Sequence, residues 1–136
     1  MSGRQSVQIS GFAHRNPVPA ASRIGPYVYS GVLAGRDPQT QQTPDTLDEQ
    51  VVLLFDRFRE LMHAVGGSLD DIIKITFWVL DYRDREAINR EWERAFPDPT
   101  SRPARQVMAA HLDEGTRVHA DLVAILPHDP TLGVST

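Results

Sequence analysis

The clearest helical pattern in the chain covers residues 46–65. Thr46 and Glu49 fit the S/T-x-x-E pattern of a capped helix N-terminus, and Gly66-Gly67 is a typical helix stop. Between these signals, apolar residues recur at spacings of three and four: Leu47, Val51, Leu54, Phe55, Phe58, Leu61, Met62 and Val65. The pattern predicts an amphipathic helix with its apolar face buried against a sheet.

A second helix is predicted from about Arg83 to Phe96. Its apolar positions, Ala87, Ile88, Trp92 and Phe96, fall on one side, and charged residues occupy the other. Proline at positions 97 and 99 ends it, because proline lacks a backbone donor and restricts the residue before it.

Five segments have the character of strands or extended chain, and one of them is the stretch after Pro103 that carries Arg105, Val107 and Ala109. Residues 12–26 carry prolines at 17, 19 and 26, which predict a loop or an edge strand. Residues 27–35 are aromatic and branched and are interrupted at Ser30-Gly31, whereas residues 72–80 are apolar on both faces, as in a central strand covered twice. In residues 116–126, Arg117, His119 and Asp121 alternate with apolar residues, which predicts a strand with one polar face.

This order of elements predicts an α+β fold, with two helices on one face of a mixed sheet. The chain of 136 residues suits a single domain, in which residues 1–26 form an N-terminal strand and loop and residues 127–136 a loose tail. No remaining segment is long enough to cover the other face of the sheet. Self-association is therefore expected.

Composition narrows the classes of partner and the compartment. The formal net charge is −4 and no basic run is interleaved with aromatics, so nucleic acid is not an expected partner. The chain has no cysteine, which excludes disulfides and thiolate chemistry and suits a reducing compartment. No apolar run approaches the length of a membrane span, and the N-terminus lacks the apolar core of a signal peptide. The expectation is a cytoplasmic protein without membrane contact.

Few residues stand out as carriers of chemistry. The histidines have no metal-ligand spacing, and the common hydrolase, phosphate-binding and dinucleotide motifs are missing from the sequence. The polar face around His119 is most often a solvated surface in such strands. Arg105 has two interpretations: a surface residue with its stem on apolar neighbours, or a fork for a substrate carboxylate beside the small side chains of Val107 and Ala109.

Six short motifs occur in an order that resembles the RidA/YjgF family of enamine/imine deaminases, also catalogued as L-PSP endoribonucleases. They are SG at 30–31, DEQ at 48–50, GGSLDDIIKITFWVLD at 66–81, IN at 88–89, RPAR at 102–105 and VHADLVAIL at 118–126. The resemblance implies a chorismate-mutase-like α+β fold and a homotrimer with three clefts between subunits. This assembly would cover the exposed sheet face.

The resemblance also implies roles for individual residues. Arg105 would hold the substrate carboxylate, Ser30 and Gly31 would contact the substrate, Gly31 through its backbone, and Asn89 would shape the site. His119 stands where the family archetype has a glutamate thought to position or activate water, with Asp121 two residues further on the same strand face. His119 and Arg105 are therefore the expected catalytic residues, and Asp121 is the alternative to His119 as the proton carrier.

Two other positions differ from the family pattern. Val107 replaces a frequent cysteine, and the GPY motif runs directly into the early strand, which leaves Tyr27 as a further candidate for substrate binding. The expected reaction is the hydrolytic deamination of a small enamine or imine carboxylate, resembling 2-aminoacrylate or an aminomuconate, with no metal and no cofactor. The alternative is a non-catalytic trimeric ligand-binding or regulatory protein; a ribonuclease ranks third because the chain is acidic.

Overall fold

The fold is described by a computed structural model, which covers residues 3–11 and 16–127. The expected loose tail over residues 127–136 therefore lies, apart from Pro127, outside the described residues. Residues 12–15, which belong to the expected proline-containing loop, also lie outside them.

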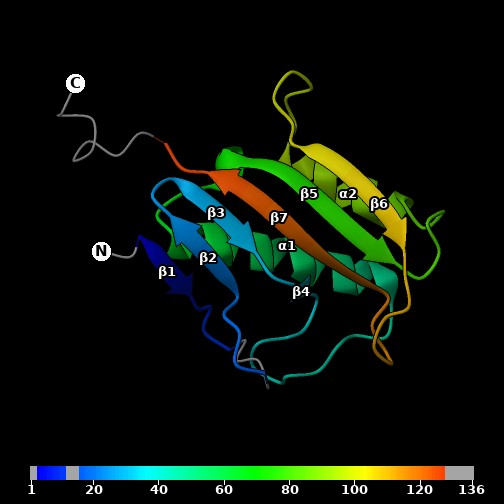
Figure 1. The fold of residues 1–136 in the computed structure, drawn as a ribbon. Coiled ribbons are helices and arrows are strands. Elements are labelled where there is room, and N and C mark those ends of the chain that lie inside the picture. The colour runs from blue at the N-terminus through cyan, green and yellow to red at the C-terminus, as the bar shows by residue number, and fades with distance from the viewer. Residues whose placement is uncertain (1–2, 12–15, 128–136) are drawn as a thin grey trace.

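A mixed sheet forms the centre of the molecule (Figure 1). Its strands follow the order β1-β2-β3-β7-β5-β6, and the short β4 pairs with β7 beyond the end of β3. The β5–β6 pair is parallel and the other pairs are antiparallel, which confirms the expected mixed sheet. The strands are β1 (Arg4–Val7), β2 (Ala21–Ile24), β3 (Tyr27–Ser30), β4 (Leu33–Ala34), β5 (Ile72–Val79), β6 (Ala104–Ala109) and β7 (Val118–Ile125).

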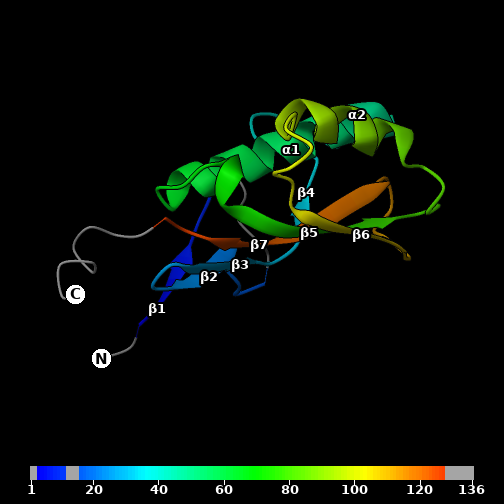
Figure 2. The ribbon, with the colours of Figure 1, turned by 90° about the horizontal axis from the view of Figure 1, so that it is seen from above.

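Two helices, α1 (Leu47–Ala64) and α2 (Glu86–Ala95), lie side by side on one face of this sheet, as Figure 2 shows. A short 3-10 turn, η1 (Leu69–Asp71), connects α1 to β5. The apolar face of α1 is fully buried around Phe55 and Phe58, whose rings contact Phe77 of β5. The predicted α+β arrangement of two helices on a mixed sheet is therefore confirmed.

The ends of α1 follow the sequence signals. The hydroxyl of Thr46 accepts a hydrogen bond from the Glu49 amide at 3.2 Å and donates one to the Glu49 carboxylate at 2.9 Å. Gly66 adopts φ +78° immediately after the helix, a conformation that glycine adopts without steric cost.

Two sequence-based expectations need correction. Residues 21–24 form an interior strand between β1 and β3 rather than a loop or edge, because the prolines at 17, 19 and 26 all lie outside the hydrogen-bonded segment. The second helix begins at Glu86 rather than near Arg83, because the Asp81 carboxylate accepts a hydrogen bond from the Arg83 amide at 3.0 Å and holds the preceding residues in a turn.

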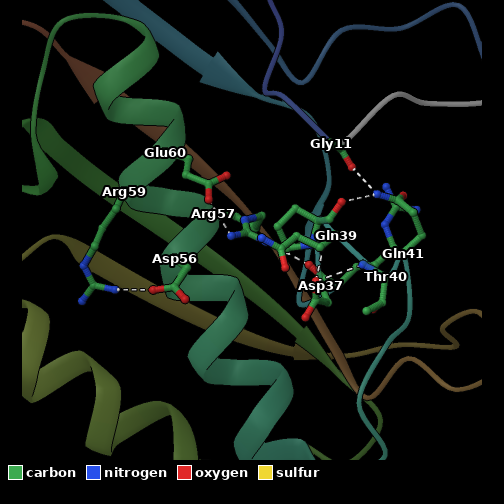
Figure 3. A network of polar contacts seen from close by, with 11 residues as sticks. Gly11, Asp37, Gln39, Thr40, Gln41, Asp56, Arg57, Arg59 and Glu60 are labelled. Carbon is green, nitrogen blue, oxygen red and sulfur yellow. Dashed lines mark hydrogen bonds and ion pairs between the residues drawn. The ribbon is translucent and has the colours of Figure 1, made fainter.

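The connection between β4 and α1 is fastened to α1 by polar contacts (Figure 3). The buried Arg57 donates to the Arg36 carbonyl at 2.9 Å and pairs with Glu60 at 2.7 Å. Asp37 accepts from the backbone amides of Gln39 and Thr40, which closes a compact turn. The chain that leaves β4 is thereby held against the middle of α1.

The fully buried Gln50 joins the start of α1 to the segment that enters β7. Its amide donates to the carbonyls of Pro44 and Gly115, and its carbonyl oxygen accepts from the Arg117 amide at 2.8 Å. At Gly35, an added Cβ would clash with the backbone of Gln50. Gln50 therefore positions the chain two residues before His119.

No helix of the described residues lies over the second face of the sheet (Figure 2). The expectation that β5 is covered on both faces is therefore not met within one copy of the chain: Lys74 is exposed and Trp78 is half-buried on this face. Among the described residues, Tyr29, Val123 and Met108 also lie on this open face or at its border, and Tyr29 is 60% exposed.

Candidate functional site

Arg105 lies in an open pocket of about 360 Å³ between β6 and α2. The pocket is lined by Asn89, Trp92, Glu93, Arg102, Pro103 and Arg105. Asn89, Trp92 and Glu93 reach it together because residues three and four apart share one face of a helix. The structure therefore brings together two of the predicted site residues, Arg105 and Asn89.

The guanidinium of Arg105 is held by an aromatic ring rather than by an acid. Its Cζ lies 5.1 Å from the centroid of the Trp92 ring, a cation–π arrangement. Within the described residues the Arg105 side chain forms no ion pair and no hydrogen bond. Burial, and to a lesser extent the charge of Arg85, lower the pKa of Arg105, but a guanidinium stays protonated at physiological pH. The arrangement leaves a cation with unused donors beside a pocket.

His119 belongs to a second group of residues on β7 and β5. Its ring lies 6.4 Å from the Trp78 ring in an edge-on arrangement, and the Trp78 indole N–H donates to the Asp121 carboxylate at 2.8 Å. Burial is the main cause that lowers the pKa of His119 below 6.5, while the negative charges of Asp121 and Asp113 partly oppose it. At neutral pH the imidazole is therefore uncharged and able to accept a proton.

Strand register places Arg105 and His119 on opposite faces of the sheet. Arg105 pairs with Ile75, which is buried under the helices, whereas His119 pairs with Trp78 on the open face. Side chains of paired residues on neighbouring strands point to the same face of a sheet, and side chains alternate between the faces along one strand. Ile75 and Trp78 are three residues apart on β5 and therefore point to opposite faces, and so do their partners Arg105 and His119. One copy of the chain therefore cannot bring the two groups to the same small molecule.

Ser30 and Gly31 lie next to the His119 group, but their backbone and hydroxyl groups are largely engaged. The Ser30 hydroxyl accepts from the Leu122 amide at 2.8 Å and donates to the Gly31 carbonyl at 2.8 Å. The Gly31 amide donates to the Ala20 carbonyl at 2.8 Å. Gly31 is exposed, and its carbonyl oxygen keeps a second lone pair that could accept a hydrogen bond from a ligand.

Two further residues lie away from both groups. Tyr27 pairs with Ile125, six residues along β7 from His119, which corresponds to about 20 Å of extended strand. Arg117 precedes β7, and its guanidinium donates to the Asp45 carbonyl rather than sharing the strand face of His119 and Asp121. The expected polar face is thus reduced to His119 and Asp121.

Sequence reasoning treated Trp92 only as core and did not assign Trp78 a role. The signal for Trp92 was available, since it stands three residues after Asn89 on a predicted helix. The indole of Trp78 reaches Asp121 only because β5 and β7 pair in this register, which no local pattern reveals.

Residues 3–11 and 16–127 contain neither a cluster of metal-ligating side chains nor a membrane-spanning helix. No group of three or more His, Cys, Asp or Glu in these residues could hold a metal ion. No helix in the same residues is long and apolar enough to cross a membrane.

The endoribonuclease L-PSP family matches residues 13–126, which includes every strand and helix from β2 to β7. The chain belongs to this family, also known as RidA/YjgF. A relative in Escherichia coli K12 named 2-iminobutanoate/2-iminopropanoate deaminase is 28% identical over 118 residues, covering 78% of this chain and 91% of the relative. The mitochondrial protein mmf2 of Schizosaccharomyces pombe is 30% identical over 95 residues, covering 69% and 72%.

Solved structures confirm the L-PSP fold. The E. coli TdcF crystal structure with bound serine superimposes with a TM-score of 0.82 over 90% of this chain and 99% of TdcF, at 21% sequence identity. At this identity the likeness shows the fold alone, and the predicted L-PSP or RidA-type architecture is therefore confirmed.

Proposed function

We propose that this protein is a hydrolytic deaminase of small imines or enamines that carry a carboxylate. In the reaction, water adds to the imine carbon, the nitrogen takes up protons, and the C–N bond breaks to give a keto acid and ammonia. Such imines already hydrolyse in water, so a protein accelerates the reaction by orienting the substrate and moving a proton. No redox change occurs, and the proposal requires no cofactor.

The observation that carries the proposal is the environment of Arg105. A half-buried guanidinium, stacked on Trp92 and without an acidic partner in the described residues, faces a pocket with the Asn89 side chain. A planar guanidinium binds a carboxylate through two parallel charge-assisted hydrogen bonds. The E. coli relative named 2-iminobutanoate/2-iminopropanoate deaminase acts, by its name, on small imino acids of this kind.

We further propose that each site lies between two copies of the chain in a homotrimer. Arg105 and Asn89 of one copy would face His119, Asp121 and the Gly31 carbonyl of the next. The opposite-face placement of Arg105 and His119, together with the open sheet face, supports this arrangement. In it, His119 accepts a proton from the attacking water, and the Gly31 carbonyl accepts a hydrogen bond from the substrate nitrogen.

The direct test is ammonia and keto acid release from 2-iminopropanoate, generated in the assay by a serine dehydratase. We expect the purified protein to increase the initial rate in proportion to its concentration, above a blank without it. Binding of a keto acid without any increase in rate would instead support the alternative, a non-catalytic ligand-binding protein of the same family.

We expect the enzyme-dependent rate to have an acidic limb that belongs to His119. As a base, His119 must be neutral; the rate should therefore be constant above its pKa and fall as pH drops through a value below 6.5. His119→Ala should remove this limb, and Asp121→Asn should move it to lower pH, because Asp121 opposes the lowering of the pKa. The measurement is the blank-corrected rate between about pH 5 and 8.

If His119→Ala has the same pH profile as the parent protein, His119 does not transfer the proton. A profile that shifts equally in Asp121→Asn and in a variant of an exposed acid elsewhere, such as Asp56→Asn, would also contradict the assignment.

A further inference from the structure

A second arginine, Arg102, lines the same pocket as Arg105. Its Nε donates to the Phe96 carbonyl at 2.9 Å, which anchors the guanidinium at the end of α2. This contact uses one of the five N–H donors of the group. In the described residues the remaining donors of Arg102 form no ion pair and no other hydrogen bond.

The acids close to Arg102 in sequence do not neutralise it by direct contact. Asp98 accepts hydrogen bonds from the Thr100 amide at 2.9 Å and from the Thr100 hydroxyl at 2.8 Å, and forms no ion pair with Arg102. Glu93 is the one carboxylate that lines the pocket with the two arginines. Asp98 thus acts on Arg102 only as a more distant charge.

Positive charge is concentrated at this pocket although the chain carries a net charge of −4. Arg85, which forms no ion pair in the described residues, contributes a third cation close enough to affect Arg105 electrostatically. By contrast, ion pairs with Asp or Glu neutralise five arginines elsewhere: Arg57, Arg59, Arg83, Arg90 and Arg94.

A substrate with one carboxylate would use Arg105 and leave Arg102 without a counter-ion. We infer that the pocket selects substrates with two acidic groups, and that Arg102 is the specificity-determining residue that binds the second one. Arg105 binds the carboxylate next to the reacting imine carbon, and Arg102 binds a carboxylate at the other end of the molecule. This inference rests on the proposed function for its reaction, which stays the hydrolysis of C=NH by water to C=O and ammonia.

The test compares substrates that differ in the second carboxylate. An amino acid oxidase supplies 2-iminobutanoate or 2-iminoglutarate in the assay, with catalase to remove peroxide. We expect the parent protein to have the higher kcat/KM for 2-iminoglutarate, because a charge-assisted contact at Arg102 contributes about tenfold or more. Arg102→Ala should lower kcat/KM for 2-iminoglutarate about tenfold more than that for 2-iminobutanoate, which has no second carboxylate.

Turnover of 2-iminobutanoate also serves as the internal measure of a folded site. Arg102→Lys should retain part of the preference, because it keeps the charge but not the fork. Arg59→Ala is the matched control, since it removes an ion-paired arginine from the exposed side of α1. The inference is wrong if the parent shows no preference for the diacid, or if Arg102→Ala affects both substrates equally.

A binding measurement separates this inference from the proposed function. By calorimetry, we expect the parent protein to bind the stable keto acid 2-oxoglutarate more tightly than 2-oxobutanoate, and Arg102→Ala to remove the difference. If the protein shows this Arg102-dependent preference for 2-oxoglutarate but hydrolyses neither imine, the deaminase proposal is wrong and the inference of a pocket for diacids is supported. If both imines are hydrolysed but neither binding nor kcat/KM depends on Arg102, the diacid inference fails and the deaminase proposal stands.

Discussion

Replacing Arg105 by alanine is expected to lower kcat/KM for 2-iminopropanoate at least tenfold. The guanidinium is half-buried on Trp92, so a carboxylate that binds there leaves bulk water and gains two charge-assisted hydrogen bonds. Such hydrogen bonds to a charged group contribute about 1.5–3 kcal/mol, which corresponds to roughly 10- to 150-fold in kcat/KM. Lysine in place of Arg105 should recover only part, because it supplies a point charge without the planar fork.

Folding controls are needed because Arg105 also contacts the core. The loss of its cation–π contact with Trp92 should cost about 0.5–1 kcal/mol of stability, so thermal unfolding should shift slightly while circular dichroism stays unchanged. Arg94→Ala is the matched control: Arg94 is 70% exposed on α2 and pairs with Glu91. If Arg105→Ala hydrolyses the imine at the parent rate, Arg105 does not bind the substrate carboxylate.

The parts of the fold that were predictable are those encoded locally. The spacing of Val51, Leu54, Phe55 and Phe58 allows only one buried face on a helix, and these four side chains are fully buried. The alternation in β7 was equally informative: Val118, Ala120 and Leu122 are buried, and His119 and Asp121 point to the other face. The interruption at Ser30-Gly31 likewise separates β3 from β4.

The two errors have different causes, strand pairing in one case and a local side-chain hydrogen bond in the other. Prolines around residues 21–24 suggested a loop or edge, but pairing with both β1 and β3 makes the segment an interior strand. The start of α2 depends on the side chain of Asp81, which competes for the Arg83 amide and delays the helix by about one turn.

The hydrophobic periodicity of the sequence could not show that Arg105 and His119 lie on opposite faces of the sheet. Alternation assigns faces within one strand, but it does not relate the faces of two strands, because a shift of one residue in register inverts every side chain. Only the pairing of Ile75 with Arg105 and of Trp78 with His119 shows that the two groups lie on opposite faces. The Trp78–Asp121 hydrogen bond depends on the same register.

The placement of Arg105 and His119 on opposite faces of the sheet leads to the second expected result. Chains with Arg105→Ala and chains with His119→Ala, each inactive alone, should regain activity when they assemble together. In a proposed site between neighbouring copies, one chain supplies Arg105 and the next supplies His119. A mixed ring of Arg105→Ala and His119→Ala chains then contains some sites with both parent residues. In an equal mixture with random order, about a quarter of the sites are intact, whatever the number of copies in the ring.

The two variants are denatured, mixed and refolded together, and ammonia release is measured per site against the parent protein treated in the same way. Each variant refolded alone gives the baseline. A mixture that shows only the mean of the two baselines would mean that Arg105 and His119 do not meet across an interface.

Mixing the parent with the double variant Arg105→Ala/His119→Ala distinguishes the arrangements further. If each site draws Arg105 and His119 from different copies, an equal mixture retains about a quarter of the parent activity per site, because both neighbours must be parent chains. If both residues served the same site from one chain, about half would remain. The strand register favours the first value, because it directs Arg105 toward the helices and His119 toward the uncovered face of the sheet.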